Sequence, residues 1–573
     1  MQWNLDDIII EKNIEERIKK FEKLLKILNP KISEKEYKRI ILESESLGEE
    51  ITKINYLPEL KEATDQKDEE AKKQKAQARD LYLKYAEVVR VLDHWIKGLE
   101  VEGLKRLDDV NANRLFKVVK DLEYGLGRSR MLAKYSLDIK SEEIITHKDT
   151  FGLEPLLDLR EIIETEQKYK INNKVIETQA ELTKLFYSAN RETRKQAYLA
   201  LLIRHKENLN KYNLVYQARV RDWQYESKLR GYKNAISQRN IGNDVSNKTI
   251  EVLLKTCKDN RNIFQELFKL KAKKLGLKKL ERWDVYAPIK TKERKVTWEE
   301  AKETVLTSFD SFWPDFGKKA RLIIEEKHID LLPSPGKRSG AFCATITPKI
   351  TPYVLLNFTG TERDILVLAH ELGHAVHSLM ANKHFGSTQQ AGLPLAETAS
   401  TLGELMVFNK MLKQETDKEI KRSLVWSKLG DAYATILRQN YFVLFEIQAF
   451  EAIKKGVTGE ELSQIYFKNL KEQFGESVEI DENFKYEWAY ISHIFETPFY
   501  CYAYNFGELL SYCLYSRYLA EGNGFIKVIE KILSSGGAVN PTKLLKDMGI
   551  DIESEKFWQS GFQVIKEWMV MVN

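Results

Sequence analysis

The chain has 573 residues, of which 43% are hydrophobic and 31% are charged, a composition that is ordinary for a folded globular protein. Its 91 basic and 85 acidic side chains leave a net charge of +6, which gives no support for binding to nucleic acid or to a membrane surface. No apolar stretch reaches the roughly 18 residues of a spanning helix, and the N-terminus lacks the pattern of a secretory signal. We therefore expect a cytoplasmic protein.

The first part of the chain predicts helices, because Leu, Ile, Lys and Glu recur at helical spacing and proline is scarce. Residues 61–80 contain almost no large apolar side chain, which favours an exposed helical hairpin arm or a mobile connector over an interaction arm. Residues 179–230 continue the pattern as two or three long helices. The four cysteines form no CxxC pair, so we expect buried free thiols at Cys257, Cys343, Cys501 and Cys513.

The pattern changes over residues 333–358, where proline and glycine surround two segments rich in β-forming residues. Ala341–Ile346 and Tyr353–Phe358 predict a small sheet, most simply a hairpin. Thr361 followed by Asp364 then fits a helix-capping pattern, and apolar residues recur at helical spacing from there. The sequence HELGH, residues 370–374, is therefore expected inside a helix that follows a strand.

On a helix, positions four apart lie one above the other, so His370 and His374 can aim their imidazoles at one ion. Glu371 lies one residue round the helix, where a base acting on a water molecule beside that ion is needed. This is the HExxH arrangement of zinc hydrolases. The alternatives are a chance match and a pair of core histidines held by hydrogen bonds.

A catalytic zinc site needs a third protein ligand. In GLPLAETASTLGELMVF, residues 392–408, Glu397 and Glu404 are seven apart and share one face of an expected helix. Carboxylates on an otherwise apolar helix are costly unless they are paired or metal-bound. Glu397 is a candidate third ligand, and Glu404 a candidate to orient a ligating histidine. Exposed helical glutamates are the alternative for both.

At these residues the chain resembles the thimet oligopeptidase and oligoendopeptidase F family of zinc peptidases, and the oligoendopeptidase F branch is the better match. The resemblance covers roughly residues 180–560, whereas residues 1–180 match only in helical character. Besides HELGHAVH and LAETASTLGE, it is carried by SANRETRKQAYLAL (188–201), KLRGYKNAIS (228–237), WDVYAP (283–288), GKRSGAFC (336–343), HIFETPFYCYAYNFGELL (493–510) and SSGGAVNP (534–541).

The resemblance implies a mainly α-helical, two-lobed body around a deep substrate channel, with a small β-sheet beside the HExxH helix. We expect an N-terminal helical region over residues 1–180 and a helical catalytic domain over residues 181–573. The resemblance also matches His370, His374 and Glu397 to the zinc ligands and Glu371 to the general base. His377 matches a recurrent histidine that is no primary ligand, and we interpret it as a packing residue or a support of the ligands.

Two further roles concern the oxyanion of the reaction and the binding of the substrate backbone. The resemblance favours His493 and one or two of the tyrosines that follow it, Tyr500 and Tyr502 foremost and Tyr504 nearby, as donors to the oxyanion of the reaction. The alternative for these tyrosines is core or rim packing. Gly340, Ala341 and Phe342 are expected to run along the substrate backbone as an edge strand, although Gly340 also fits a plain turn.

The sequence thus predicts a zinc-dependent endopeptidase that cuts internal bonds of short peptides, with one zinc ion per chain. The resemblance implies that short peptides are the partners and that folded proteins are excluded. The alternatives are a zinc exopeptidase such as a dipeptidyl carboxypeptidase, and a non-catalytic helical peptide-binding protein. No GxMEN-like signature for holding a terminal amine is present. Mn²⁺ or Co²⁺ also suits nitrogen and oxygen ligands.

Overall fold

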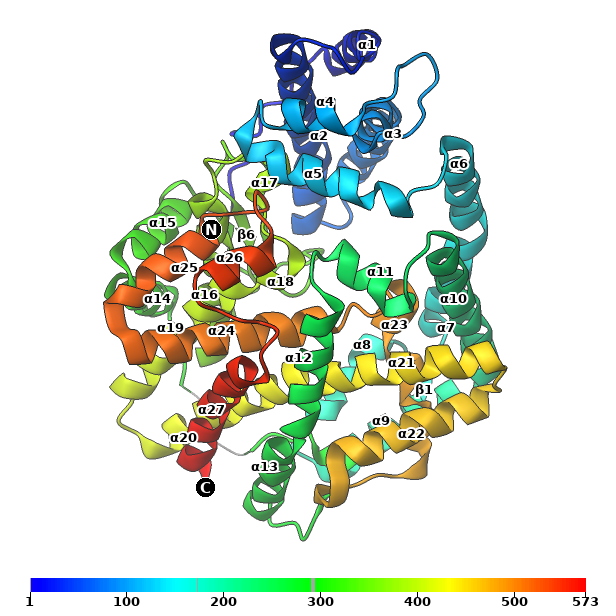
Figure 1. Ribbon diagram of the computed structural model, residues 1–573. Coiled ribbons are helices and arrows are strands. Elements are labelled where there is room, and N and C mark those ends of the chain that lie inside the picture. Colours follow the sequence, from blue (N-terminus) through cyan, green and yellow to red (C-terminus); the bar gives the residue numbers. More distant parts are fainter. Residues whose placement is uncertain (1, 173, 290–293) are drawn as a thin grey trace. The chain divides into compact units, whose positions relative to one another are not determined.

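The computed structural model describes residues 2–172, 174–289 and 294–573. Helices form most of this part of the chain, and its sheets are small (Figure 1). The expected mainly α-helical fold is therefore confirmed. The four cysteines are free, as expected, but only Cys257, Cys501 and Cys513 are buried, whereas Cys343 is partly exposed. Among the described helices, none combines the length and the apolar character that crossing a membrane requires.

The chain divides into two compact units, and each is assembled from three separate stretches. Unit 1 comprises Met1–Asp138, Glu293–Gln414 and Arg517–Ile550, and unit 2 comprises Ile139–Lys292, Glu415–Ser516 and Asp551–Asn573. The boundary expected near residue 180 falls inside unit 2, and the division into an N-terminal region and a catalytic domain stays a prediction. The expected substrate channel also stays a prediction.

Unit 1 holds the HELGH helix and the small sheet. Its helices and strands are α1 (Ile14–Leu25), α2 (Glu34–Thr64), α3 (Glu69–Lys97), α4 (Asp109–Phe116), α5 (Glu123–Leu132), α14 (Trp298–Phe312), α15 (Pro314–Glu325), β4 (Ile329–Asp330), β5 (Phe342–Ala344), β6 (Tyr353–Leu355), α16 (Glu362–Met380), α17 (Gly386–Gln389), α18 (Leu393–Ala396), α19 (Thr398–Gln414), α25 (Ile526–Leu533) and α26 (Pro541–Asp547).

Unit 2 is also helical and carries two short strand pairs. Its elements are α6 (Ile139–Lys148), α7 (Glu154–Thr165), β1 (Tyr169–Ile171), β2 (Lys174–Ile176), α8 (Gln179–Lys184), α9 (Arg191–Glu207), α10 (Leu209–Leu229), α11 (Ala235–Gly242), α12 (Asn247–Asp259), α13 (Arg261–Lys274), β3 (Leu280–Glu281), α20 (Lys418–Ala432), α21 (Gln439–Lys455), α22 (Gly459–Phe474), β7 (Val478–Glu479), α23 (Ser492–Glu496) and α27 (Glu555–Val572). Helix α24 (Tyr502–Glu521) crosses the unit boundary after Ser516.

The charged segment 61–80 forms the end of α2 and the start of α3, and these two helices pack against each other. Each helix begins at a side-chain cap: the Ser33 hydroxyl accepts a hydrogen bond from the Glu36 amide at 3.2 Å, and the Asp68 carboxylate accepts one from Ala71 at 2.9 Å. Such caps satisfy backbone N–H groups that have no partner within the helix. The expected helical hairpin is therefore confirmed.

The small sheet of unit 1 has the strand order β4–β6–β5. β5 pairs antiparallel with β6, with Cys343 opposite Val354, as the two sequence segments predicted. β4, which lies parallel to β6, was not predicted, because a strand of two residues has no periodicity to read. Since β6 is central, β5 is an edge strand of this sheet.

An apolar core joins the sheet to the N-terminal part of unit 1. The core comprises Trp3, Ile8, Leu60, Ala63, Ala344, Ile346, Ile350, Tyr353 and Leu355, which come from the first residues of the chain, the end of α2 and the sheet. Tyr56 and Phe342 pack against it. Burial of this apolar surface attaches α2 to the sheet, although more than 250 residues separate them in the chain.

Candidate metal centre and active site

Helix α16 begins where the capping pattern predicted. The Asp364 carboxylate accepts hydrogen bonds from the backbone amides of Thr361 and Thr359, each at 2.9 Å. These bonds satisfy amides at the helix N-terminus, where a negative charge is also favoured by the helix dipole. The helix places His370 and His374 on one face, with ring centroids 4.9 Å apart.

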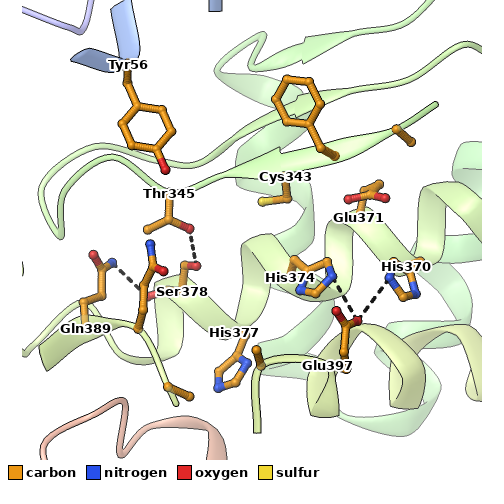
Figure 2. Close-up of a pocket in the computed structure, with 15 residues that line it drawn as sticks. Tyr56, Cys343, Thr345, His370, Glu371, His374, His377, Ser378, Gln389 and Glu397 are labelled. Carbon is orange, nitrogen blue, oxygen red and sulfur yellow. Dashed lines mark hydrogen bonds and ion pairs between the residues drawn. The ribbon is translucent and has the colours of Figure 1, made fainter. Parts of the chain in front are cut away.

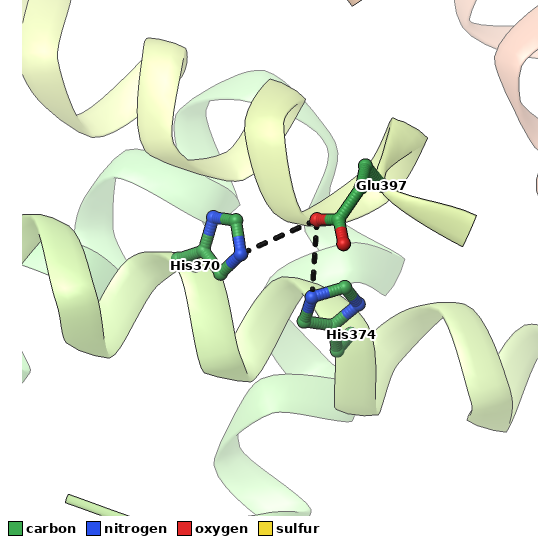
Figure 3. Close-up of side chains that lie close together, drawn as sticks. All are labelled: His370, His374 and Glu397. Carbon is green, nitrogen blue, oxygen red and sulfur yellow. Dashed lines mark ion pairs between the residues drawn. The ribbon is translucent and has the colours of Figure 1, made fainter. Parts of the chain in front are cut away.

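Glu397 lies in the turn between α18 and α19, and its side chain meets both histidines (Figure 3). One carboxylate oxygen, Oε2, is 3.3 Å from Nε2 of His370 and 3.3 Å from Nε2 of His374. The three ligand atoms lie within 4.8 Å of one another, and no other group of three His, Cys, Asp or Glu side chains in the described residues meets this condition. The donors are two nitrogens and one oxygen, a set that suits zinc.

The electrostatics of this cluster favour a positive charge at its centre. Burial opposes ionisation of Glu397, but hydrogen bonds and charge from the two histidines outweigh it and lower the pKa of the carboxyl group. Burial likewise opposes the charged form of His370, and the carboxylates of Glu397 and Glu404 outweigh it and raise the pKa of the imidazole. The cluster thus stabilises a bound cation, whether a proton or a metal ion.

Two residues of α19, Ser400 and Glu404, contact members of the ligand cluster. The Ser400 hydroxyl donates a hydrogen bond to Glu397 Oε2 at 2.9 Å. Glu404 Oε2 lies 3.5 Å from Nδ1 of His370, the ring nitrogen that faces away from Glu397. An acceptor on that nitrogen determines the tautomer and the orientation of a ligating imidazole. Glu404 therefore lies where its predicted supporting role needs it, whereas the contact of Ser400 with Glu397 was not foreseen.

The close approach of α16 and α19 depends on Gly373, inside the HELGH sequence. A Cβ atom at this position would lie 2.5 Å from the Cα of Ser400 and 2.7 Å from the carbonyl oxygen of Ala399. Such distances are impossible without a shift of the backbone, so only glycine fits here. No role for Gly373 was predicted from the sequence, because the close approach of two helices leaves no local pattern in the chain.

Glu371 lies next to the ligand histidines on α16 and near the small sheet (Figure 2). Its side chain is 7% exposed, and burial raises the pKa of its carboxyl group, although the histidines on either side partly offset this. It lines a cavity of about 420 Å³ that also contains His370, His374 and Glu397 (Figure 2). A buried carboxylate with a raised pKa beside a candidate metal site has the surroundings that suit a general base.

The expected substrate strand is partly placed at this cavity. Ala341 and Phe342 line it, and they lie on or just before the edge strand β5. Gly340 is not among the lining residues. Its backbone is left-handed, with φ +85°, and the space around it is open, so its conformation explains the glycine and fits the alternative of a turn.

His377 lies one helical turn beyond His374 and is buried. Burial lowers the pKa of its imidazole to about 4, so the ring is neutral near pH 7. The ring forms a hydrogen bond with the backbone of Ala396, next to Glu397, and its Nε2 has no hydrogen-bond partner in the described chain. These surroundings agree with the expected packing or supporting role, and His377 is not part of the three-residue ligand group.

The other predicted catalytic residues lie in unit 2. Nε2 of His493 and the hydroxyl of Tyr504 are 3.1 Å apart, and the ring of Tyr500 stacks on His493 with centroids 6.1 Å apart. Tyr502, in contrast, is fully buried, and its hydroxyl accepts a hydrogen bond from Asn243 at 2.8 Å. Tyr502 thus fits the packing alternative better, and Tyr504, not Tyr502, lies beside His493 and Tyr500.

The backbone just before Tyr500 has an unusual conformation. Phe499 has φ +59°, which is rare for a bulky residue, and its amide donates a hydrogen bond to the buried carboxylate of Glu446 at 2.7 Å. Backbone in such regions is maintained only by its surroundings and is frequent at functional sites. This observation singles out the His493–Tyr504 segment independently of its residue types.

Comparison with known proteins places this geometry in a family. Residues 184–564 match Peptidase family M3. The oligoendopeptidase F homolog of Lactococcus lactis subsp. lactis (strain IL1403) is 24% identical over 534 residues, which span 91% of this chain and 87% of that protein. Oligopeptidase PepF of Bacillus subtilis (strain 168) is 26% identical over 387 residues, which span 66% of this chain and 57% of that protein.

Solved structures share the fold. A Chlamydophila abortus protein superposes with a TM-score of 0.86 at 23% identity, covering 100% of this chain and 97% of that one. Oligoendopeptidase-F from Enterococcus faecium gives a TM-score of 0.73 at 19% identity and covers 98% and 96% of the two chains. These matches confirm the resemblance that the motifs indicated, and the family match spans more than half of the sequence. The chain therefore belongs to peptidase family M3.

Proposed function

We propose that this protein is a zinc-dependent endopeptidase that hydrolyses internal bonds of short peptides, with one zinc ion per chain. The observation that carries the proposal is the group of His370, His374 and Glu397 beside the buried carboxylate of Glu371, all on one cavity. The relatives named oligoendopeptidase and oligopeptidase support short peptides as the substrates. A location in the cytoplasm stays a prediction from the sequence.

The roles follow from the chemistry of the side chains. His370, His374 and Glu397 would hold the metal, and Glu404 and Ser400 orient His370 and Glu397. A zinc ion bound there would lower the pKa of a water molecule and polarise the scissile carbonyl. Glu371 accepts the proton of the attacking water and delivers it to the leaving amine. His493, Tyr500 and Tyr504 are proposed to donate hydrogen bonds to the developing oxyanion.

The test is digestion of internally quenched peptides of about 5–20 residues that are blocked at both ends, a length range that rests on the family resemblance. We expect internal cleavage, loss of activity with a chelator and recovery with zinc. An exopeptidase needs a free terminus and would leave the blocked peptides intact, and a non-catalytic peptide-binding protein would cleave nothing. Efficient digestion of casein would contradict the restriction to short substrates.

We expect His374→Ala to bind less than one zinc ion per chain, whereas the wild type binds one. The substitution removes one of three protein ligands, and a site with two protein ligands binds zinc too weakly to retain it during dialysis. Elemental analysis after dialysis measures this directly, without any activity assay. His147→Ala, at an exposed histidine of α6, is the matched control and should retain the metal of the wild type. Equal zinc contents in His374→Ala and wild type would refute the ligand assignment.

We expect His493→Ala and Tyr504→Phe to lower kcat by about 10–10³-fold, because each removes a donor to the oxyanion. KM should change little, since such a bond forms only in the transition state. Tyr502→Phe serves as the comparison: its hydroxyl is already bonded to Asn243, so it should affect stability more than kcat. Steady-state kinetics and melting temperatures separate the two effects. Normal kcat in both His493→Ala and Tyr504→Phe would exclude a catalytic role.

A further inference from the structure

The cavity at the metal cluster continues well beyond the residues assigned so far. From Glu371 and the histidines it runs along β5, past Cys343 and Thr345, to the ring of Tyr56 (Figure 2). Tyr56 belongs to α2, in the part of the chain for which the sequence indicated nothing beyond helices. A helix remote in sequence therefore supplies one wall of the candidate active site.

The walls of this extension are uncharged. Apart from Glu371, the two ligand histidines, His377 and Glu397, the cavity is lined by Tyr56, Ala341, Phe342, Cys343, Thr345, Ser378, Gln389, Gln390, Ala391 and Ala396. A charged substrate group placed there would lose its hydration without gaining an ionic partner, which is costly. The extension therefore favours uncharged side chains.

Among the polar groups of these walls, the hydroxyl of Tyr56 stays available for a bound molecule. The hydroxyls of Thr345 and Ser378 bond to each other at 2.5 Å, and the Gln389 amide donates to the carbonyl of Ser378 at 3.2 Å. The Tyr56 hydroxyl, in contrast, forms no hydrogen bond with the described residues and points into the cavity beside Thr345 (Figure 2). Tyr56 thus offers both an aromatic face and a free hydroxyl to a bound molecule.

Tyr56 is held firmly in this position. Its ring packs against the core that joins α2 to the sheet. Just beyond, the amide of Arg338 donates to the carbonyl of Ala63 at 2.9 Å, and the amide of Gln66 donates to the carbonyl of Gly336 at 2.7 Å. These bonds tie the end of α2 to the loop that leads into β5. A side chain supported in this way is preorganised for recognition.

The edge strand sets the distance between Tyr56 and the reacting bond. A peptide that adds to the free edge of β5 would lie extended along the cavity. In Figure 2, Glu371 lies on the other side of Cys343 from Tyr56, so the separation spans at least the two steps from Cys343 to Thr345 and at most the four steps from Ala341 to Thr345. At about 3.3 Å per residue, these steps cover roughly 7–13 Å. The substrate side chain that meets Tyr56 is therefore about two to four residues away from the bond that is cut.

We propose that Tyr56, with Thr345 beside it, forms a subsite for an uncharged substrate side chain located two to four residues from the scissile bond, and that Tyr56 determines its specificity. This inference rests on the proposed peptidase function, which it deepens by naming the class of peptide. The preferred side chains are Gln, Asn and Tyr, which can share a hydrogen bond with the phenol, and Phe, which can only pack against its aromatic face.

The experiment is digestion of a blocked peptide library in which each position around a common cleavage site is varied in turn. For the wild type we expect kcat/KM to be about tenfold lower for Asp, Glu, Lys and Arg than for uncharged residues at one position in that range. Tyr56→Ala should flatten this preference at that position alone. Tyr56→Phe should retain the preference for Phe and lose that for Gln and Asn.

Tyr85→Phe is the matched control, because Tyr85 packs in the N-terminal helical core and does not line the cavity. Its cleavage profile should equal that of the wild type. Melting temperatures show whether each variant is folded, and Tyr56→Phe keeps the test decisive should Tyr56→Ala fail to fold. Identical profiles for the wild type and the folded Tyr56 variants would overturn the inference.

A binding measurement separates failure of this inference from failure of the proposed function. The dissociation constants of an uncharged peptide and of its Glu-substituted counterpart are compared in Glu371→Gln and in Glu371→Gln combined with Tyr56→Phe or Tyr56→Ala. Discrimination that disappears with Tyr56 supports the subsite even if no peptide is cut. Cleavage without any effect of Tyr56, in kinetics or in binding, refutes the subsite and leaves the peptidase proposal intact.

Discussion

Replacing Glu371 by glutamine is expected to lower turnover by about 10²–10⁴-fold or more, while the protein stays folded and keeps its metal. An amide matches a carboxylate in size, so the buried position on α16 is filled as before, but an amide cannot accept the proton of the attacking water. Glu371 is not in the ligand group, so its loss removes no bond to a metal. Kinetics with a quenched peptide, elemental analysis and a melting curve test the three parts of this expectation.

The control for Glu371→Gln is the same substitution at Glu362, in the first turn of the same helix and outside the cavity lining. Its turnover should stay close to that of the wild type. A Glu371→Gln enzyme with more than about a tenth of the wild-type rate would show that another group is the base, since loss of a general base costs at least 10²-fold. Loss of zinc in this variant would instead point to a structural role for Glu371.

Replacing Gly373 by alanine is expected to separate α16 from α19 and thereby to weaken the metal centre. The added Cβ would lie 2.5 Å from Ser400 Cα, and backbone on both sides leaves nothing that can rotate away. Forced overpacking of this kind typically costs about 1–3 kcal/mol of unfolding free energy. Because His370 and His374 lie on one helix and Glu397 is attached to the other, the shift also moves the ligands apart.

The matched control is Gly430→Ala, in α20, where an added Cβ has open space within 4 Å. In a helix, alanine is favoured over glycine by roughly 0.5–1 kcal/mol, so this variant should be unchanged or slightly more stable. Chemical denaturation and zinc content report the two effects for both variants. Gly373→Ala with wild-type stability and one tightly bound zinc ion would contradict the packing argument.

Local sequence determined the elements that carry the chemistry. The capping pair Thr361–Asp364 predicted where α16 begins, and the i, i+4 spacing of His370 and His374 predicted that their rings share one face. Both are properties of a single helix, whose geometry repeats every 3.6 residues whatever surrounds it. The strand pair β5–β6 was also predicted from local sequence, because proline, glycine and β-forming residues influence the backbone conformation only within a few positions.

Only the tertiary structure determined which residues far apart in the chain meet at the site. Tyr56 meets the cavity from α2, Ser400 bonds to Glu397, and Gly373 allows two helices to touch, each through contacts across a packed interface. The interleaved stretches of the two units were likewise hidden, since chain order predicts neighbours only over short separations. Such contacts depend on which apolar surfaces are buried against each other. Because the hydrophobic effect has no preferred direction, a short stretch of sequence does not specify its packing partner, and the partner follows only from the whole fold.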